Sequence, residues 1–197
     1  MSGATTSAPA WPVRQVARLA LIAALVFVTD RLATHAWSGW ALDLVNLAFH
    51  EAGHVFLRPF GHTLHYLGGT LFQLGVPILL VWYFLFRRSA AFAAATCLWW
   101  LGESLVNVAV YMADARNLEL NLVGGGEHDW NELFHRFNLL GEDAVAAISS
   151  TTHAVGVFVM LLGLAWGALF VLPAIVRSSL VLRLATVAPR AVRLLAD

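Results

Sequence analysis

The chain has 197 residues, of which 59% are hydrophobic and only 12% are charged, and its mean hydropathy is +0.72. Because soluble domains carry about 25% charged residues, this composition excludes an ordinary soluble protein and predicts a single-domain, all-α integral membrane protein. Acidic and basic residues are equal in number, every basic one is arginine, and no nucleic-acid-binding motif is present. The single cysteine, Cys97, excludes an intrachain disulfide and a zinc site built from cysteines.

The first two segments of the chain differ sharply in polarity. Residues 1–12 contain little besides Ala, Ser, Thr and Pro, so we expect a disordered tail. Arg14 and Arg18 then precede the apolar run 19–28, an order that also occurs in signal peptides. Since no cleavage site of small residues follows directly, we interpret residues 13–36 as the first membrane-spanning helix.

The next helix, expected over residues 38–60, contains the most informative motif. His50, Glu51 and His54 spell H-E-x-x-H inside an apolar segment. On a helix, His50 and His54 lie one turn apart on the same face, so their imidazoles can bind one metal ion. Glu51 lies beside that face, where its carboxylate can take a proton from a water that Zn²⁺ activates. The alternative is that both histidines merely hydrogen-bond to neighbours, but polar residues in a membrane segment are costly and are therefore functional candidates.

Asp43 and a pair of glycines flank the motif, and each allows two interpretations. Asp43 lies two turns before His50 on nearly the same face, where it can orient a ligand or simply stabilise the start of its helix. The apolar span expected over residues 64–86 contains Gly68 and Gly69, which let helices approach closely. Close packing is the simpler explanation for these glycines, and room for a substrate strand is the alternative.

A further span, expected over residues 91–113, carries a stripe of polar side chains. Glu103, Asn107 and Asp114 follow one another at spacings of four and seven, so they share one face. An unpaired charge at the depth of Glu103 is expensive, so this side chain either faces the protein interior or is protonated. This face is therefore predicted to look into the protein, towards the helix that carries the H-E-x-x-H motif.

A polar segment, residues 114–150, follows this span and contains a run of three glycines at 124–126. Asp129 and Glu132 match a variant of the capping box, which predicts a short helix over residues 130–140. A capping role would fully explain why an aspartate stands at this position.

The third metal ligand is expected to come from this polar segment. His128 has no capping role to explain it, and the preceding glycines give it reach, so we rank it first. Asp114 ranks second, and His153 and Asp129 come after it. A third ligand is needed because a catalytic zinc site has three protein ligands and leaves one position open. If Asp114 is not a ligand, its carboxylate can instead fix the tautomer of a liganding histidine.

The last long helix is expected to begin at Glu142 and Asp143 and to cross the membrane over residues 153–176. The remaining residues, 177–197, place arginines among apolar side chains. This pattern is typical of a basic amphipathic helix that lies on an anionic membrane surface.

The positions of the arginines predict the orientation in the membrane. Arg87 and Arg88, like the arginines near both termini, should be cytoplasmic. Residues 114–150 hold seven acidic residues and two arginines, so they should lie outside. About four crossings satisfy these positions if the helix over 38–60 is re-entrant or shallow. Both termini are then cytoplasmic and the metal site faces the outer side, and the lysine-free, alanine-rich composition suits a bacterial inner membrane.

The sequence His-Glu-Ala-Gly-His at residues 50–54, in a polytopic protein, resembles the intramembrane zinc metalloproteases of the site-2 protease group. The resemblance implies that His50 and His54 bind Zn²⁺, that Glu51 activates water, and that an aspartate in a later transmembrane helix completes the site. The Leu-Asp-Gly element of that family is absent here, and the nearest counterpart surrounds Asp114. The resemblance covers the motif and the membrane setting.

These features together predict a zinc-dependent metallopeptidase that cleaves a peptide or membrane-protein substrate in or next to the lipid bilayer. In a second interpretation the protein binds a metal but is a different hydrolase or an oxidoreductase. The oxidoreductase is less well supported, because His62 and His65 add only one further H-x-x-H motif, fewer than membrane iron oxygenases use. A third interpretation is a non-catalytic assembly or transport factor, for which we would expect a damaged motif, more spans or an internal repeat.

Overall fold

The structure is a computed structural model that describes residues 13–34, 41–122 and 127–172. In these residues the regular structure is helical throughout, which confirms the all-α prediction. The elements are α1 (Val13–Ala33), α2 (Ala41–Leu57), the 3-10 turn η1 (Arg58–Phe60), α3 (His62–Phe86), α4 (Ala91–Ala113), α5 (Asp129–Arg136) and α6 (Glu142–Ala168). The expected tails, 1–12 and 177–197, lie outside the described residues.

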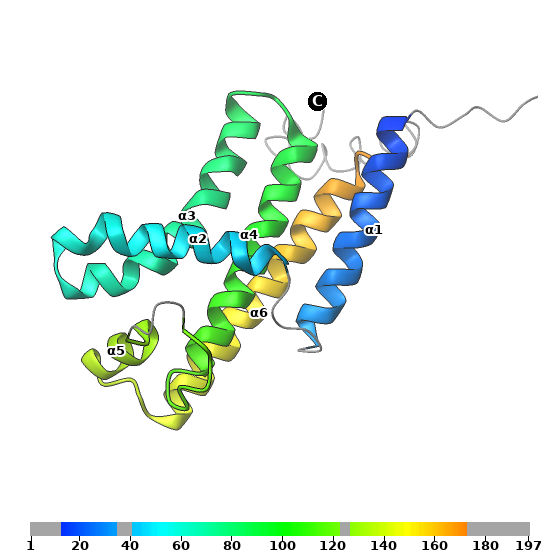
Figure 1. Ribbon diagram of the computed structural model, residues 1–197. Coiled ribbons are helices and arrows are strands. Elements are labelled where there is room, and N and C mark those ends of the chain that lie inside the picture. Colours follow the sequence, from blue (N-terminus) through cyan, green and yellow to red (C-terminus); the bar gives the residue numbers. More distant parts are fainter. Residues whose placement is uncertain (1–12, 35–40, 123–126, 173–197) are drawn as a thin grey trace, which may run out of the picture.

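The centre of the fold is the pair α4 and α6, which run side by side in opposite directions (Figure 1). Glycines allow this close approach. A Cβ atom added to Gly102 would overlap the backbone of Met160, and one added to Gly156 would crowd Gly102 and Val106. Inside a membrane, apolar side chains gain little by leaving lipid, so helices associate through such close packing rather than through exclusion of water.

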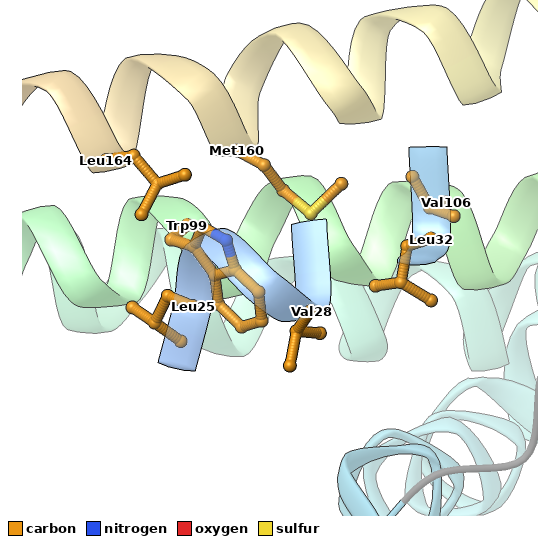
Figure 2. Packing of buried hydrophobic residues seen from close by; sticks show 7 residues of the cluster. All are labelled: Leu25, Val28, Leu32, Trp99, Val106, Met160 and Leu164. Carbon is orange, nitrogen blue, oxygen red and sulfur yellow. The ribbon is translucent and has the colours of Figure 1, made fainter. Parts of the chain in front are cut away.

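A hydrophobic cluster joins α1 to this pair (Figure 2). Trp99 of α4 lies in it, and its indole N–H donates to Thr29 Oγ1 of α1 at 2.8 Å, so the buried polar end of the ring is satisfied. The remaining members come from all three helices: Leu25, Val28, Leu32, Val106, Met160 and Leu164.

Helix α2 and the first half of α3 form a hairpin that lies across the α4–α6 pair instead of running along it (Figure 1). The turn between them includes Gly61 at φ +99°, a backbone conformation that favours glycine. The hairpin closes tightly, because a Cβ added to Gly53 would overlap the backbone of Gly68. The second half of α3, which contains Pro77, turns to follow the α4–α6 pair. Close packing, the simpler of the two explanations for the glycines of α3, therefore holds for Gly68.

Three of the described helices, α3, α4 and α6, are long and apolar enough to cross a membrane, which makes this a candidate multi-pass membrane protein. Large apolar side chains such as Leu79 and Phe158 are exposed on their outer faces, where lipid would cover them. The expected spans over 64–86 and 91–113 coincide with α3 and α4.

Two expected spans differ from the structure. Residues 13–33 do form a helix, α1, but it is not among the three candidate spans, because charged side chains flank its apolar run on both sides: Arg14, Arg18, Asp30 and Arg31. The last helix, α6, begins at Glu142 as expected, but it ends at Ala168, before the predicted end of its span at residue 176. Within the described residues, three candidate spans replace the four expected.

The two short helices were predicted with shifted ends. The motif helix, expected over 38–60, is α2 over Ala41–Leu57 followed by η1, and it is shorter than the candidate spans. The helix expected over 130–140 is α5, which starts at Asp129 and already ends at Arg136. The start of α5 one residue earlier changes which side chain caps it, and this affects the site.

Candidate metal centre

Two histidines and one carboxylate meet where α2 faces the start of α5. His50 Nε2 lies 2.8 Å from Asp129 Oδ2, and His54 Nε2 lies 3.1 Å from the same oxygen. One possible ligand atom from each residue lies within 4.8 Å of those of the remaining two, so the group could hold a metal ion. All three side chains are buried or half-buried. The one-turn spacing that placed His50 and His54 on one face is confirmed.

The opposite nitrogen of each imidazole is held by an oxygen that can only accept. His50 Nδ1 lies 3.2 Å from Gln73 Oε1, and His54 Nδ1 lies 2.8 Å from the backbone carbonyl oxygen of His65. Each Nδ1 therefore carries the proton, so in a neutral imidazole Nε2 presents a lone pair. Two such lone pairs aimed at one carboxylate oxygen repel it unless positive charge lies between them. This donor arrangement is the one that liganding histidines usually show.

The pKa directions agree with a site that attracts positive charge. The hydrogen bond to Asp129 raises the pKa of His54, more than its burial lowers it. Burial alone would raise the pKa of Asp129, but the hydrogen bonds that His50 and His54 donate when a proton takes the place of a metal ion outweigh burial and hold that pKa below its usual value. The pocket between the three side chains thus stabilises an anionic carboxylate beside a cation.

Tyr111 of α4 holds Asp129 in place. Its hydroxyl accepts a hydrogen bond from the backbone N–H of Asp129 at 3.1 Å and lies 3.5 Å from Asp129 Oδ2. The ring of Tyr111 also meets that of His50 edge to face, with centroids 5.8 Å apart. Asp129 is therefore held by α4 as well as by the two histidines, which limits the movement of a possible ligand.

A cavity of about 710 Å³ opens beside the group and is lined by His50, Glu51, His54 and Asp129. Glu51 is exposed, as its position next to the ligand face predicts. The walls are largely apolar and include Leu47, Val106 and Val110, while further polar side chains come from several elements: Asp43, Tyr66, Gln73, Glu103, Asn107, Tyr111, Asn121 and Glu127. The volume lies within the roughly 300–1,000 Å³ of small-molecule sites.

Gly69 of α3 lies directly against the His50 ring. A Cβ added at this position would overlap the imidazole, so a Gly69→Ala variant must displace either the ring or the helix. We expect its affinity for Zn²⁺ to fall by at least the ~10–100-fold that loss of a supporting partner usually costs. Gly75, six residues along the same helix, has nothing within 4 Å of an added Cβ, so Gly75→Ala is the matched control. Chelator competition measures both, and equal affinities would contradict the predicted steric effect.

His128, the residue ranked first as third ligand, lies next to Asp129 but faces another way. Its Nδ1 accepts a hydrogen bond from the backbone N–H of Asn131 at 3.2 Å, which makes His128 the N-cap of α5. Its Nε2 lies 3.4 Å from Asp114 Oδ2, and burial lowers its pKa. The capping role predicted for Asp129 therefore belongs to His128, and Asp129 is the residue that the structure brings to the histidine pair.

Asp114 and His153, the two further candidates for the third ligand, have local partners outside the group of three. The carboxylate of Asp114 accepts hydrogen bonds from the backbone N–H groups of Glu119 and Leu120, at 2.9 and 3.1 Å, and so shapes the turn after α4. His153 Nε2 lies 3.2 Å from the carbonyl oxygen of Leu32, which ties α6 to the end of α1.

Two of the three residues in the predicted polar stripe, Glu103 and Asn107, face α2 as expected, whereas Asp114 does not. Glu103 accepts a hydrogen bond from Asn46 Nδ2 at 2.9 Å, and Asn107 Nδ2 donates to Asp43 Oδ1 at 3.0 Å. Glu103 is buried, with 1% of its surface exposed, so this pairing satisfies a carboxyl group that would otherwise be costly. Both Glu103 and Asn107 line the cavity.

Three supporting residues had been given no role from the sequence, namely Asn46, Gln73 and Tyr111. The available signal was the isolated amide in an apolar helix, since Gln73 is the one amide side chain in α3 and is 3% exposed. An amide at such a depth must find a partner, so it points to a polar interior.

Comparison of the chain with protein-family models, curated proteins and solved structures finds no match. The geometry of the group His50, His54 and Asp129 therefore carries the functional argument.

Proposed function

We propose that this protein is a membrane-embedded, zinc-dependent metallopeptidase, in which His50, His54 and Asp129 bind Zn²⁺ and Glu51 acts as general base. One observation carries the proposal: both Nε2 atoms converge on a single carboxylate oxygen while both Nδ1 atoms are held by carbonyl oxygens. Two imidazoles and one carboxylate are the ligand set of several catalytic zinc sites, in which the fourth position stays open for water or substrate.

The resemblance to the site-2 protease group supports the same set by residue type. In that group an aspartate completes the two histidines of the motif. Here Asp129 would do so, although it lies at the start of α5 and not within a candidate span. The chemistry of the donors fits Zn²⁺, which readily combines imidazole nitrogen with carboxylate oxygen.

Glu51 and the cavity suggest how the hydrolysis proceeds. Bound Zn²⁺ would polarise the scissile carbonyl and acidify a water molecule. The Glu51 carboxylate takes a proton from that water while the water oxygen forms a bond to the carbonyl carbon. The same carboxyl then gives the proton to the amide nitrogen as the carbon–nitrogen bond breaks, which leaves one carboxylic acid and one amine. Glu51 ends in the charge state in which it began.

The apolar cavity walls favour an apolar peptide segment as substrate. Leu47, Val106 and Val110 line the cavity beside the polar group, and the bilayer would supply such segments from membrane proteins. The charge pattern predicts a bacterial inner-membrane protein with the site on the outer side; two cytoplasmic termini require that α1 crosses together with the three candidate spans α3, α4 and α6.

Reporter fusions test this orientation. The turn between α3 and α4 holds Arg88, and the segment after α4 holds Glu119, so these two points lie at opposite ends of α4. A fusion after Arg88 is expected to be active in the cytoplasm and one after Glu119 outside it. Two fusions that both report the cytoplasm would contradict the orientation.

The proposed activity is tested with the purified protein in detergent or lipid nanodiscs. Elemental mass spectrometry is expected to find about one zinc ion per chain, as the single group of three among the described residues predicts. Mass spectrometry of a peptide library should show cleavage that a chelator abolishes and Zn²⁺ restores. Bound iron without peptide cleavage would instead favour an oxidoreductase, since two histidines and a carboxylate also bind Fe²⁺.

A further inference from the structure

Four side chains form an unbroken chain of hydrogen bonds that leads from the start of α2 to the metal group. Asn107 Nδ2 lies 3.0 Å from Asp43 Oδ1, Gln73 Nε2 lies 2.8 Å from Asn107 Oδ1, and His50 Nδ1 lies 3.2 Å from Gln73 Oε1. The chain passes from α2 to α4, then to α3 and back to α2. We name these four residues, Asp43, Asn107, Gln73 and His50, the Asp43 relay.

The orientation of each amide in the relay follows from the Asp43 carboxylate at its end. A carboxylate can only accept, so Asn107 must turn its amide nitrogen to Asp43 and its oxygen to Gln73. Gln73 must then donate to Asn107 and accept from His50, which leaves Nδ1 as the protonated nitrogen of His50. Reversing any one amide would set two donors or two acceptors against each other, and a buried mismatch of this kind is costly.

The tautomer of His54, the second histidine of the motif, does not depend on a side-chain amide. His54 Nδ1 is held by the backbone carbonyl oxygen of His65, which is fixed by the helix and cannot invert. The partner of His50 is a side-chain amide, which presents oxygen in one orientation and nitrogen in the opposite one. His50 therefore has a defined tautomer only if something outside the pair fixes that amide. Asn107 Oδ1 accepts from Gln73 Nε2 at 2.8 Å, whereas the backbone carbonyl oxygen of Ser104 lies at 3.5 Å and is the weaker partner.

We propose that Asp43, acting through Asn107 and Gln73, sets the tautomer of His50 and so turns Nε2 of this residue into a metal ligand. Asp43 is a positioning residue, because it touches Asn107 and is not a member of the metal group. A carboxylate at the end of the relay also polarises the amides in series, which makes His50 a stronger ligand. The consequence for metal affinity rests on the proposed function, whereas the tautomer of His50 does not.

The simpler role of Asp43 is to stabilise the first turn of α2 through the helix dipole. That role predicts an effect on stability, and it predicts nothing specific for His50. Asp143 supplies a matched control, since it is an exposed carboxylate in the first turn of α6. An Asp143→Asn variant loses the same kind of dipole interaction and leaves the relay intact.

The first experiment is a Zn²⁺ titration against a competing chelator. In Asp43→Asn the new amide can donate to Asn107, and the whole relay can reverse until Gln73 donates to His50 Nδ1. His50 Nε2 would then carry the proton and could not bind. We expect the affinity to fall about 10–100-fold, as for comparable partners that orient a liganding histidine, and Asp143→Asn to match the wild type. Equal affinities for Asp43→Asn and the wild type would overturn the proposal.

A second substitution should rescue the first. In the Asp43→Asn, Gln73→Glu double variant, a carboxylate stands next to His50 and accepts its Nδ1 proton directly. The new amide at position 43 can donate to Asn107, which in turn donates to the new carboxylate, so every bond of the relay is satisfied. Affinity should return towards the wild-type value. Gln73→Glu alone should bind worse than this double variant, because it sets two acceptors against each other. A double variant no better than Asp43→Asn would overturn the proposal.

Nitrogen NMR of histidine-labelled, metal-free protein reads the tautomer directly. The signal of His50, identified by its loss in His50→Gln, should show a protonated Nδ1 in the wild type and in the double variant, and a protonated Nε2 in Asp43→Asn. A wild type that binds no zinc but shows these tautomers would refute the proposed function and support the relay. Since Asp129 Oδ2 lies 2.8 Å from His50 Nε2 and can accept a proton from it in the metal-free protein, the decisive atom is Nδ1. A wild type in which His50 Nδ1 carries no proton would refute the relay.

Discussion

An Asp129→Ala variant is expected to lose the bound metal, whereas a His128→Asn variant is expected to keep it. Asp129 Oδ2 lies within 3.1 Å of both His50 Nε2 and His54 Nε2, and no further carboxylate or histidine of the described residues joins this group. Its removal takes away one of three ligands. The loss of affinity should therefore exceed the ~10–100-fold typical of an outer partner. Elemental mass spectrometry after dialysis measures this as metal per chain.

His128→Asn is the informative control, because asparagine keeps the capping function. His128 accepts the backbone N–H of Asn131 at the start of α5, and asparagine is among the residues that N-caps prefer. His128→Ala would instead lose the cap at a cost of about 1 kcal/mol and could displace Asp129 indirectly. If His128→Asn loses the metal and Asp129→Ala keeps it, His128 is the third ligand and our assignment is wrong.

The helical architecture follows from the sequence because its signals are local. Apolar stretches long enough to cross a bilayer identify α3 and α4, and Glu142 with Asp143 marks the start of α6. The first helix shows the limit of this argument. Hydropathy located α1, but the charges near both of its ends keep it out of the candidate spans. The arrangement of α2 across the bundle depends on contacts with α3, and those lie beyond any single segment.

Part of the candidate site was also predictable. The spacing in H-E-x-x-H places His50 and His54 on one face of any helix, whatever the tertiary structure. The third member of the group depends on where α5 begins. His128 and Asp129 are adjacent, and either can cap a helix or face the histidines. Because the helix starts at Asp129, His128 becomes the cap and Asp129 points to α2. A difference of one residue in a helix start exceeds what local sequence patterns resolve.

The relay was visible only in part for the same reason. Asp43 and Asn107 stand on faces that point towards the motif, and their spacing suggested a supporting role. The link between them and His50 is Gln73, which comes from α3 and has no regular spacing to either residue. Long-range pairs of this kind arise from the packing of three helices and leave no periodic signal in the sequence.

Glu51→Gln is expected to abolish peptide hydrolysis while leaving metal binding intact. Glutamine has nearly the same shape as glutamate and no charge, so it cannot take the proton of the attacking water. Glu51 lines the cavity beside His54 but is not one of the three residues of the metal group. General bases contribute about 10²–10⁴-fold to the rate, so the barrier should rise by about 3–5 kcal/mol.

The measurement is the rate of cleavage per bound zinc ion, with the metal content of each sample determined in parallel. Glu119→Gln is the matched control, because Glu119 is exposed and does not line the cavity, so the same loss of charge should leave the rate unchanged. Undiminished cleavage by Glu51→Gln with full zinc content would rule out Glu51 as the base. A loss of zinc in this variant would show instead that Glu51 takes part in holding the metal. Since the Nδ1 partners of both histidines lie on α3 and not beside Glu51 on α2, we expect the metal group to remain intact and only the proton transfer to fail.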